Sequence, residues 1–174
     1  MDVAEFEAFL QAYERDLFSF CRYLAMSEDV ASDLYQETAL QAFKMIAHID
    51  SSQNPKSLLF GIAVGKWKNM RRKAIRRQNI APEISFEGAT NTHDKSATPE
   101  EAAQNALLRD CIQKTLASMP DKFRIPLVLY YFDDSPTDVI ASICKIPKGT
   151  VKSRLHRGRA LMKEALEKEG FSGG

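Results

Sequence analysis

The chain has 174 residues, 44% of them hydrophobic, and its 24 basic and 23 acidic side chains leave a net charge of +1. This length accommodates one domain or two small ones, and the apolar fraction is ordinary for a folded protein. No uncharged apolar run reaches the roughly 18 residues of a membrane span, and the N-terminus lacks a signal-peptide pattern, so we expect a soluble cytoplasmic protein. The cysteines Cys21, Cys111 and Cys144 are far apart and show no CxxC pairing, which favours reduced, buried thiols.

Charge is strongly segregated along the chain, although its sum is small. Residues 1–50 contain 10 acidic and 3 basic side chains, whereas residues 51–80 contain 8 basic and no acidic ones. Two stretches, 56–77 and 145–163, lack any acidic residue. Basic blocks of this kind can be solvated faces and nothing more, but two of them on helical patterns favour the binding of a polyanion.

The N-terminal part of the chain has apolar residues at the 3–4 spacing of helices. A first helix is predicted over about residues 6–24, and a second from a cap at Ser27 to about His48. Residues 50–55 have the composition of a loop, and a third helix is predicted over about residues 57–77. The residues expected to face inward on this third helix are Leu59, Ile62, Ala63, Met70 and Ala74, with Trp67 packing at the edge of that face.

The remaining chain is also predicted to be helical, after a polar segment without periodicity. A helix opens at Thr98 with a proline in its first turn and runs through Met119, and further helices follow at about 122–132, 136–144 and 147–168. The expected fold class is therefore all-α, with two small helical domains. We place these domains at residues 1–77 and 105–174, joined by a flexible linker at 78–104.

Residues 136–159 have the pattern of a helix-turn-helix unit. A capping box at Ser135 opens the short helix, a tight turn follows at 145–147, and the second helix is basic. On the basic helix Val151, Leu155, Gly158 and Met162 share an inward face, and Gly149, Ser153, His156 and Ala160 lie opposite. Small residues on a basic outer face suit insertion into the major groove, although an ordinary helical hairpin remains the alternative.

Residues 146–155, together with Ile140 and Ala141, resemble the promoter-binding C-terminal domain of bacterial extracytoplasmic-function sigma factors. The apolar run at 125–132 is also typical of that domain. The chain departs from the family at Val139, Lys145 and Gly158, where the family usually has Glu, Gly and Ala. The resemblance implies that the −35 promoter element is recognised by Lys148, Thr150, Lys152, Ser153, His156 and Arg157.

Residues 33–37 resemble the DLxQE segment with which these sigma factors bind core RNA polymerase. Asp33 and Glu37 are one helical turn apart and share a face with Gln36, so they could dock on a basic helical surface. Taken alone, the same residues could equally form a solvated acidic face on a core helix. The resemblance implies that Asp33, Gln36 and Glu37 bind the polymerase.

Residues 57–73 resemble the family's helix for the −10 promoter element, and the loop before it corresponds to the loop that captures flipped-out bases. A cationic outer face beside a polar loop suits a melted strand held by its backbone. The family has a Trp where Leu58 stands, and Asn and Asp where Gly65 and Asn69 stand. The residues implied in binding and melting this element are Ser51, Gln53, Asn54, Lys68, Arg71 and Arg72.

The resemblance spans about residues 6–77 and 105–165, and it implies an alternative sigma factor that binds core RNA polymerase, recognises both promoter elements and promotes melting. It also implies an anti-sigma partner, often membrane-bound. The alternative is a polymerase-independent helix-turn-helix regulator, which leaves residues 33–37 and the 57–77 helix without a role. Because His48, His93 and His156 lack metal-ligand spacing and no nucleophile motif occurs, we expect no enzyme, cofactor or metal.

Overall fold

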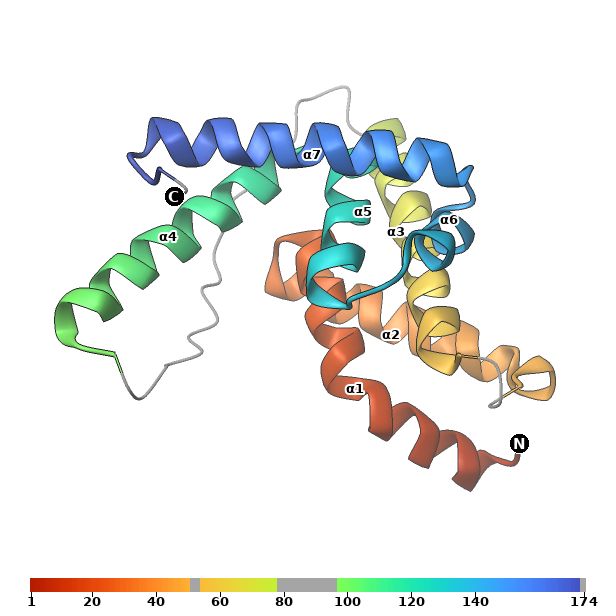
Figure 1. Ribbon diagram of the computed structural model, residues 1–174. Coiled ribbons are helices and arrows are strands. Elements are labelled where there is room, and N and C mark those ends of the chain that lie inside the picture. Colours follow the sequence, from red (N-terminus) through yellow and green to blue (C-terminus); the bar gives the residue numbers. More distant parts are fainter. Residues whose placement is uncertain (51–53, 78–96, 173–174) are drawn as a thin grey trace.

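The computed structural model describes residues 1–50, 54–77 and 97–172, and this part of the chain contains helices and no strand (Figure 1). The predicted all-α class is thus confirmed. None of the described helices is long and apolar enough to cross a lipid bilayer. The α-helices in these ranges are α1 (Val3–Ala25), α2 (Glu28–Lys44), α3 (Pro55–Arg77), α4 (Pro99–Ser118), α5 (Asp121–Phe132), α6 (Thr137–Cys144) and α7 (Lys148–Lys168).

Helices α1, α2 and α3 form the N-terminal half. A capping box opens α1: the Glu5 backbone N–H donates to the Asp2 carboxylate and the Asp2 N–H donates to the Glu5 carboxylate, both at 2.8 Å. Ser27 stands at the N-cap of α2 as predicted, but its side chain makes no capping bond. Helix α2 ends at Lys44, and the remaining predicted residues up to His48 form a short 3₁₀ turn, Ile46–His48.

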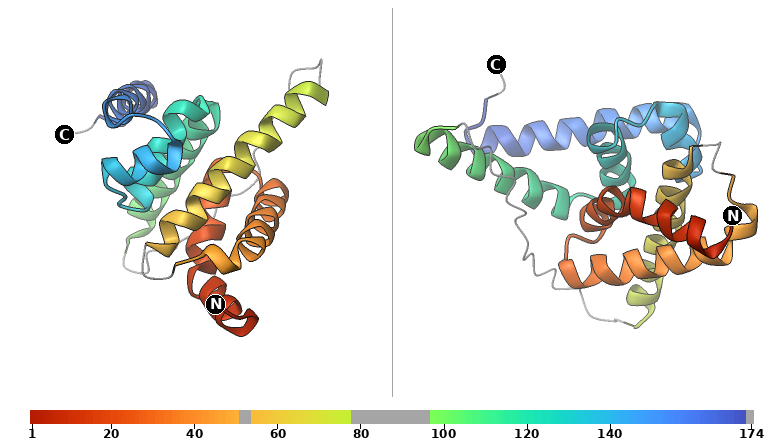
Figure 2. Two further views of the ribbon diagram at one scale, coloured as in Figure 1. Left: turned by 90° about the vertical axis from the view of Figure 1, so that its right-hand side faces the viewer. Right: turned by 90° about the horizontal axis from the view of Figure 1, so that it is seen from below.

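Helix α3 lies between the two halves and is buried on two sides (Figure 2). Leu59 and Ala63 are buried as predicted, and Trp67 is 6% exposed, which confirms its place in the core. Phe60 and Val64 are buried as well. Ala74 is exposed, so its predicted inward position is wrong. The C-terminal end of α3 projects beyond the described helices that cover its middle (Figure 2).

Helices α4 to α7 form the C-terminal half, in which α7 contacts α4, α5 and α6. Thr98 and Glu101 form a reciprocal capping box at the start of α4. The capping box predicted at Ser135 is wrong. Pro136 is the N-cap of α6 without a side-chain bond, and the Ser135 hydroxyl donates instead to the carboxylate of Asp133. The helix begins one residue later than the capping box requires, so the Ser135 oxygen is out of register with the free N–H groups of the first turn.

The predicted linker, residues 78–104, lies largely outside the described residues. The described part begins at residue 97, and α4 begins at Pro99, so residues 99–104 are helical. The boundaries of the two proposed domains therefore stay a prediction. What the structure shows directly is that the two halves contact each other, α3 against α6 and α1 against α5.

The contact between the halves is partly apolar. The rings of Tyr23 on α1 and Phe132 on α5 lie 4.0 Å apart between centroids. Buried residues from both halves, among them Leu24, Trp67 and Ile143, belong to one continuous apolar cluster. The chain therefore has one core that extends through α3 into both halves, rather than two separate ones.

The turn between α6 and α7 has the conformation expected of it. Lys145 adopts the left-handed region with φ 55° and ψ 48°, and the Ile146 backbone N–H donates to the Ala141 carbonyl at 3.0 Å. A side chain with a Cβ costs about 1 kcal/mol in this conformation, which glycine adopts freely. The departure from the family's glycine is therefore a real local strain.

Gly158 serves a purpose that its sequence context did not reveal. A Cβ built on Gly158 would lie 2.8 Å from Cδ1 and 2.9 Å from Cγ of Leu127 on α5. The backbone of α7 thus approaches α5 more closely than alanine permits. Glycine within a helix costs about 0.5–1 kcal/mol relative to alanine. The close packing of α7 against α5 offsets this cost at Gly158.

Gly158→Ala is predicted to lower the free energy of unfolding by about 1 kcal/mol, because overpacking against Leu127 costs more than the gain in helix propensity. Urea denaturation followed by circular dichroism measures this. In a Leu127→Ala background the same substitution should be neutral or stabilising. Stabilisation of the otherwise unchanged protein by Gly158→Ala would contradict the packing argument.

Lys145→Gly is predicted to raise the free energy of unfolding by about 0.5–1 kcal/mol, because glycine relieves the left-handed strain at the end of α6. The matched control is Lys163→Gly at an exposed position inside α7, where the same substitution should cost about 1 kcal/mol. Thermal or urea unfolding distinguishes the two. Equal destabilisation by both substitutions would refute the assignment of strain.

Candidate nucleic-acid interface

The outer face of α7 presents the predicted recognition residues to solvent. Val151 and Leu155 are buried against the rest of the half, which fixes the rotation of the helix about its axis. Gly149 is exposed, and a Cβ there would meet nothing within 4 Å. The six predicted residues all lie away from the core, Lys148, Lys152, Ser153, His156 and Arg157 exposed and Thr150 half-buried.

This face has the electrostatics of a surface for polyanions. The first turn of α7 contains no acidic residue, so its free backbone N–H groups and Lys148 present the same sign of charge. The Ser153 hydroxyl donates to the Thr150 carbonyl at 3.0 Å and still has lone pairs to accept a further bond. Small polar side chains between exposed cations permit close approach to a groove.

The predicted polymerase-binding residues lie together on the exposed face of α2. Leu34 and Thr38 face the core, and the Thr38 hydroxyl donates to the Leu34 carbonyl at 2.7 Å. Asp33, Gln36 and Glu37 are all exposed on the other side. A Glu37 carboxylate oxygen lies 3.4 Å from the Lys66 ammonium of α3, which orients that carboxylate.

The three predicted cations of α3 are not equivalent. Arg72 is exposed and donates to the Asn69 side chain at 2.7 Å within the same helix. Lys68 is exposed, and its ammonium lies 3.5 Å from the Cys144 carbonyl of α6. Arg71 is half-buried, and its Nε lies 3.5 Å from the carboxylate of Asp121 at the start of α5. Two of the three cations therefore contact the C-terminal half, whereas the sequence assigned all three to a cationic outer face.

In the predicted base-capture loop, Ser51 and Gln53 lie outside the described residues. Asn54 is exposed with φ 29°, and its side-chain oxygen accepts the Ser57 backbone N–H at 3.2 Å. This bond satisfies a free N–H in the first turn of α3. The Asn54 oxygen thus stabilises the start of α3.

A polar network at the junction of the halves was missed by sequence reasoning. The Trp67 indole N–H donates to Oδ2 of Asp121 at 3.0 Å, and Arg124 Nη2 lies 2.6 Å from its Oδ1. Arg124 is 5% exposed and also donates to the backbone carbonyls of Leu116 at 3.2 Å and Leu24 at 2.7 Å. The one sequence feature that could have indicated this network is the position of Arg124 directly before the apolar run at 125–132.

Burial lowers the pKa of Arg124, and the adjacent Asp121 carboxylate opposes this effect. A second ionic contact between the halves lies at Lys56, whose ammonium is 2.6 Å from Asp133 and 3.0 Å from Asp16. Burial lowers the pKa of Lys56, but hydrogen bonds to Asp133 and Asp16 outweigh it, and the net shift is upward. The carboxylates thus favour the charged form of both cations, and at Lys56 their effect on the pKa exceeds that of burial.

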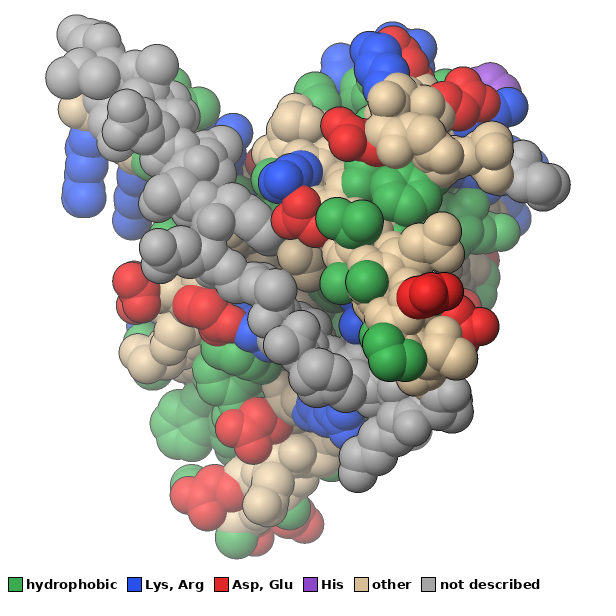
Figure 3. All heavy atoms as spheres, turned by 90° about the vertical axis from the view of Figure 1, so that its left-hand side faces the viewer, with side chains coloured by type: hydrophobic (Ala, Val, Ile, Leu, Met, Phe, Trp, Pro, Cys, Tyr) green, Lys and Arg blue, Asp and Glu red, His purple; other side chains and the backbone are tan. Residues whose placement is uncertain are grey.

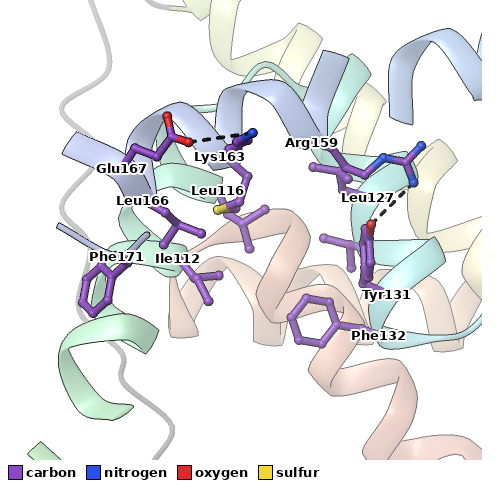
Figure 4. A pocket seen from close by; sticks show the side chains of 12 residues that line it. Ile112, Leu116, Leu127, Tyr131, Phe132, Arg159, Lys163, Leu166, Glu167 and Phe171 are labelled. Carbon is purple, nitrogen blue, oxygen red and sulfur yellow. Dashed lines mark hydrogen bonds and ion pairs between the residues drawn. The ribbon is translucent and has the colours of Figure 1, made fainter. Parts of the chain in front are cut away.

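Two hollows open on the described surface. One of about 710 Å³ lies between α3 and α6, and Lys66, Asn69 and Lys145 are among its lining residues. The other, of about 440 Å³, lies between α4, α5 and α7 and is almost wholly apolar (Figure 4). Tyr131 and Phe132 form one end of this second hollow, and the Tyr131 hydroxyl is 3.5 Å from Arg159 (Figure 4).

Hydrophobic side chains are also exposed on the face of the molecule that Figure 3 shows, over the lobe that α4 and the end of α7 form. Leu107 on α4 is 63% exposed, and Phe132 is 53% exposed. Exposed apolar side chains that group together are typical of contacts with other proteins. Periodicity alone did not predict this exposed apolar surface. The same spacing of apolar residues is expected whether a helix packs against its own core or against another protein.

Comparison with known proteins places both halves in one family. Residues 9–77 match the model of sigma-70 region 2, and residues 109–162 match the model of sigma-70 region 4. The chain is 29% identical over 169 residues to the extracytoplasmic-function sigma factor SigW of Bacillus subtilis, covering 95% of this chain and 90% of the relative. It is 26% identical over 163 residues to the sigma-E factor of Escherichia coli, covering 91% and 84%.

The fold has solved counterparts. The sigma factor RpoE of Bartonella quintana, crystallised with the anti-sigma factor NepR, matches with a TM-score of 0.77 at 23% identity, over 95% of this chain and 98% of that one. CnrH in complex with the cytosolic domain of CnrY matches with a TM-score of 0.67 at 18% identity, over 96% and 90%. The two family models together cover more than half of the chain, in the order of the two halves described above. The chain belongs to the extracytoplasmic-function sigma factors of the sigma-70 family.

Proposed function

We propose that the exposed surfaces of α2, α3 and α7 each perform one of the binding functions of a sigma factor. The acidic face of α2 binds core RNA polymerase, α7 recognises the −35 element as a duplex, and α3 with the loop before it binds and holds open the −10 element. The observation that carries this proposal is the exposed basic face of α7, which is held outward by the burial of Val151 and Leu155.

The chemistry of α7 supports recognition of a duplex. Its cations Lys148, Lys152 and Arg157 lie at the margins of the outer face and are placed to contact phosphates. Ser153 and His156 lie nearer the middle of that face, where a helix in the major groove presents side chains to base edges. Phosphate contacts then set the position of the helix, and the central polar groups set its preference for sequence.

The chemistry of α3 supports binding of a melted strand. Lys68 and Arg72 are exposed on a helix whose opposite side is buried in the core, so the cationic face has a fixed direction. A single strand is held mainly through its backbone, and flipped bases are bound in compensation for lost stacking. Melting in this way requires positioned donors and no nucleophile or metal, so we infer an initiation factor that is not itself an enzyme.

The exposed carboxylates of α2 support a contact with polymerase rather than with DNA. Asp33 and Glu37 would repel a phosphate backbone but suit a basic helical surface. A polymerase-independent regulator would leave this acidic face unused, and the match of residues 9–77 to sigma-70 region 2 does not favour it.

An anti-sigma factor is the inferred regulatory partner. Two chains of similar fold were solved as complexes, one of them named as a complex with an anti-sigma factor. The exposed apolar surface of the C-terminal half offers a contact of the kind that such a partner would cover. Because polymerase and promoter DNA are cytoplasmic in bacteria, we place the protein in the cytoplasm.

Reversing the charge of the α2 face with Asp33→Lys and Glu37→Lys is predicted to reduce transcription from a cognate promoter at least tenfold, because the charge-assisted contact with polymerase becomes repulsive. Transcription with purified core polymerase is the measurement. The control is Glu7→Lys with Glu14→Lys, an equal charge change on exposed positions of α1. Undiminished transcription by the α2 variant would remove this face from the polymerase contact.

Lys152→Ala with Arg157→Ala is predicted to weaken promoter binding by the polymerase complex and to lower the slope of log K against log salt by about 1 to 2, since each lost phosphate contact contributes about 0.9. Filter binding at several salt concentrations provides the slope. Lys163→Ala with Lys168→Ala removes the same charge from the far end of α7 and should leave the slope unchanged. An unaltered slope for the first pair would exclude α7 from the DNA contact.

A further inference from the structure

The contacts between the two halves converge on one carboxylate. Oδ2 of Asp121 accepts the Trp67 indole N–H at 3.0 Å and lies 3.5 Å from Nε of Arg71. Both donors belong to α3, whereas Asp121 begins α5 in the other half. The Arg71 guanidinium also lies over the Trp67 ring, 5.7 Å from its centroid, so the two donors are held beside each other.

The other oxygen of the Asp121 carboxylate is held by a buried arginine of the same helix. Oδ1 of Asp121 is 2.6 Å from Nη2 of Arg124, and that nitrogen also donates to the Leu24 carbonyl of α1 at 2.7 Å. Arg124 is almost fully buried, so this bond does not fluctuate freely with solvent. The bond to Arg124 therefore fixes the orientation of the Asp121 carboxylate toward α3.

An indole N–H beside a guanidinium N–H is a site for an oxyanion. A carboxylate and a phosphodiester present similar anionic oxygens to such donors, and both form short, charge-assisted hydrogen bonds with them. Arg71 lies on the same cationic helix as Lys68 and Arg72, which are exposed. The position that Asp121 occupies is thus continuous with the surface assigned above to a DNA backbone.

We propose that the free chain is closed on itself, with Asp121 filling an anion site formed by Trp67 and Arg71 that a DNA phosphate takes when the halves separate. This inference rests on the proposed function of α3 in binding promoter DNA. In the closed form Lys68 is likewise engaged, with the Cys144 carbonyl 3.5 Å away, and α6 lies against α3. Closure and DNA binding then exclude each other at the same donors.

The contact is of a kind that can open. Besides the buried apolar residues and the Arg124 bond to Leu24, it includes partly exposed ion pairs such as Lys56 with Asp133 at 2.6 Å. Pairs of this kind are modest in strength and weakened by salt. Because only the open form binds DNA through this site, the apparent Kd equals the intrinsic Kd divided by the open fraction. Any substitution that opens the chain without touching α3 should tighten DNA binding by the same factor.

The direct test uses the full-length chain without polymerase. Asp121→Asn should raise affinity for a fluorescein-labelled single-stranded oligonucleotide about tenfold, because the competing charge is gone and the open fraction rises. Trp67 is the single tryptophan of the sequence, so acrylamide quenching of its fluorescence reports opening without DNA. Quenching should increase in Asp121→Asn at the same time.

Asp134→Asn is the matched control, since it removes the same charge from an exposed position just after α5 and should change neither readout. Asp133→Asn is a second opening variant that acts through Lys56 and leaves the anion site intact, and it should also increase both readouts. Adding Arg71→Ala to Asp121→Asn should abolish most of the gain in affinity. Circular dichroism verifies that each variant is folded.

The outcomes separate this inference from the proposed function. Equal DNA affinity and equal quenching for Asp121→Asn, Asp133→Asn and Asp134→Asn would overturn the closed state, even if transcription depends on α2 and α7 as proposed. Increased quenching without any gain in DNA affinity would show that the chain opens but that Trp67 and Arg71 do not form a DNA site, which would overturn the anion-site proposal. Increased quenching and affinity that Arg71→Ala reverses would support it.

Discussion

The placement of α3 is the constraint on which the rest of the structure depends. Leu59 and Ala63 bury one side of this helix with α1 and α2, while Trp67 connects it through Asp121 to the C-terminal half. Where this helix is covered on two sides, the side left to solvent contains Lys68, and Arg72 follows one turn later. The direction of the cationic face is therefore a consequence of core packing, and the same packing brings the C-terminal half against it.

Local features could be predicted from the sequence, because they depend on neighbours in the chain. The spacing of Val151 and Leu155 defined the buried side of α7, and Thr98 with Glu101 indicated where α4 begins. Contacts between distant segments could not be predicted in this way. Nothing around Gly158 indicates that Leu127 approaches it, and the pairing of Asp121 with Trp67 spans 54 residues.

The departures from prediction share a physical cause, which is competition among partners that the sequence does not reveal. Ser135 could cap α6, but Pro136 occupies the N-cap position and the Ser135 hydroxyl donates to Asp133. Arg71 could point to solvent, but a carboxylate from the other half lies 3.5 Å away. Gly158 could weaken α7, but the space that it leaves is filled by α5. In each case tertiary structure supplies a stronger interaction than the local pattern anticipates.

Charge segregation connects these details with initiation of transcription, since acidic α2 and the basic faces of α3 and α7 suit different partners. Footprinting of a promoter by core polymerase with and without the chain tests this division most directly. The account predicts two separated protected elements and permanganate-reactive thymines at the downstream one, both only when polymerase and chain are present together. A single protected site that forms without polymerase, with no reactive thymines, would contradict it.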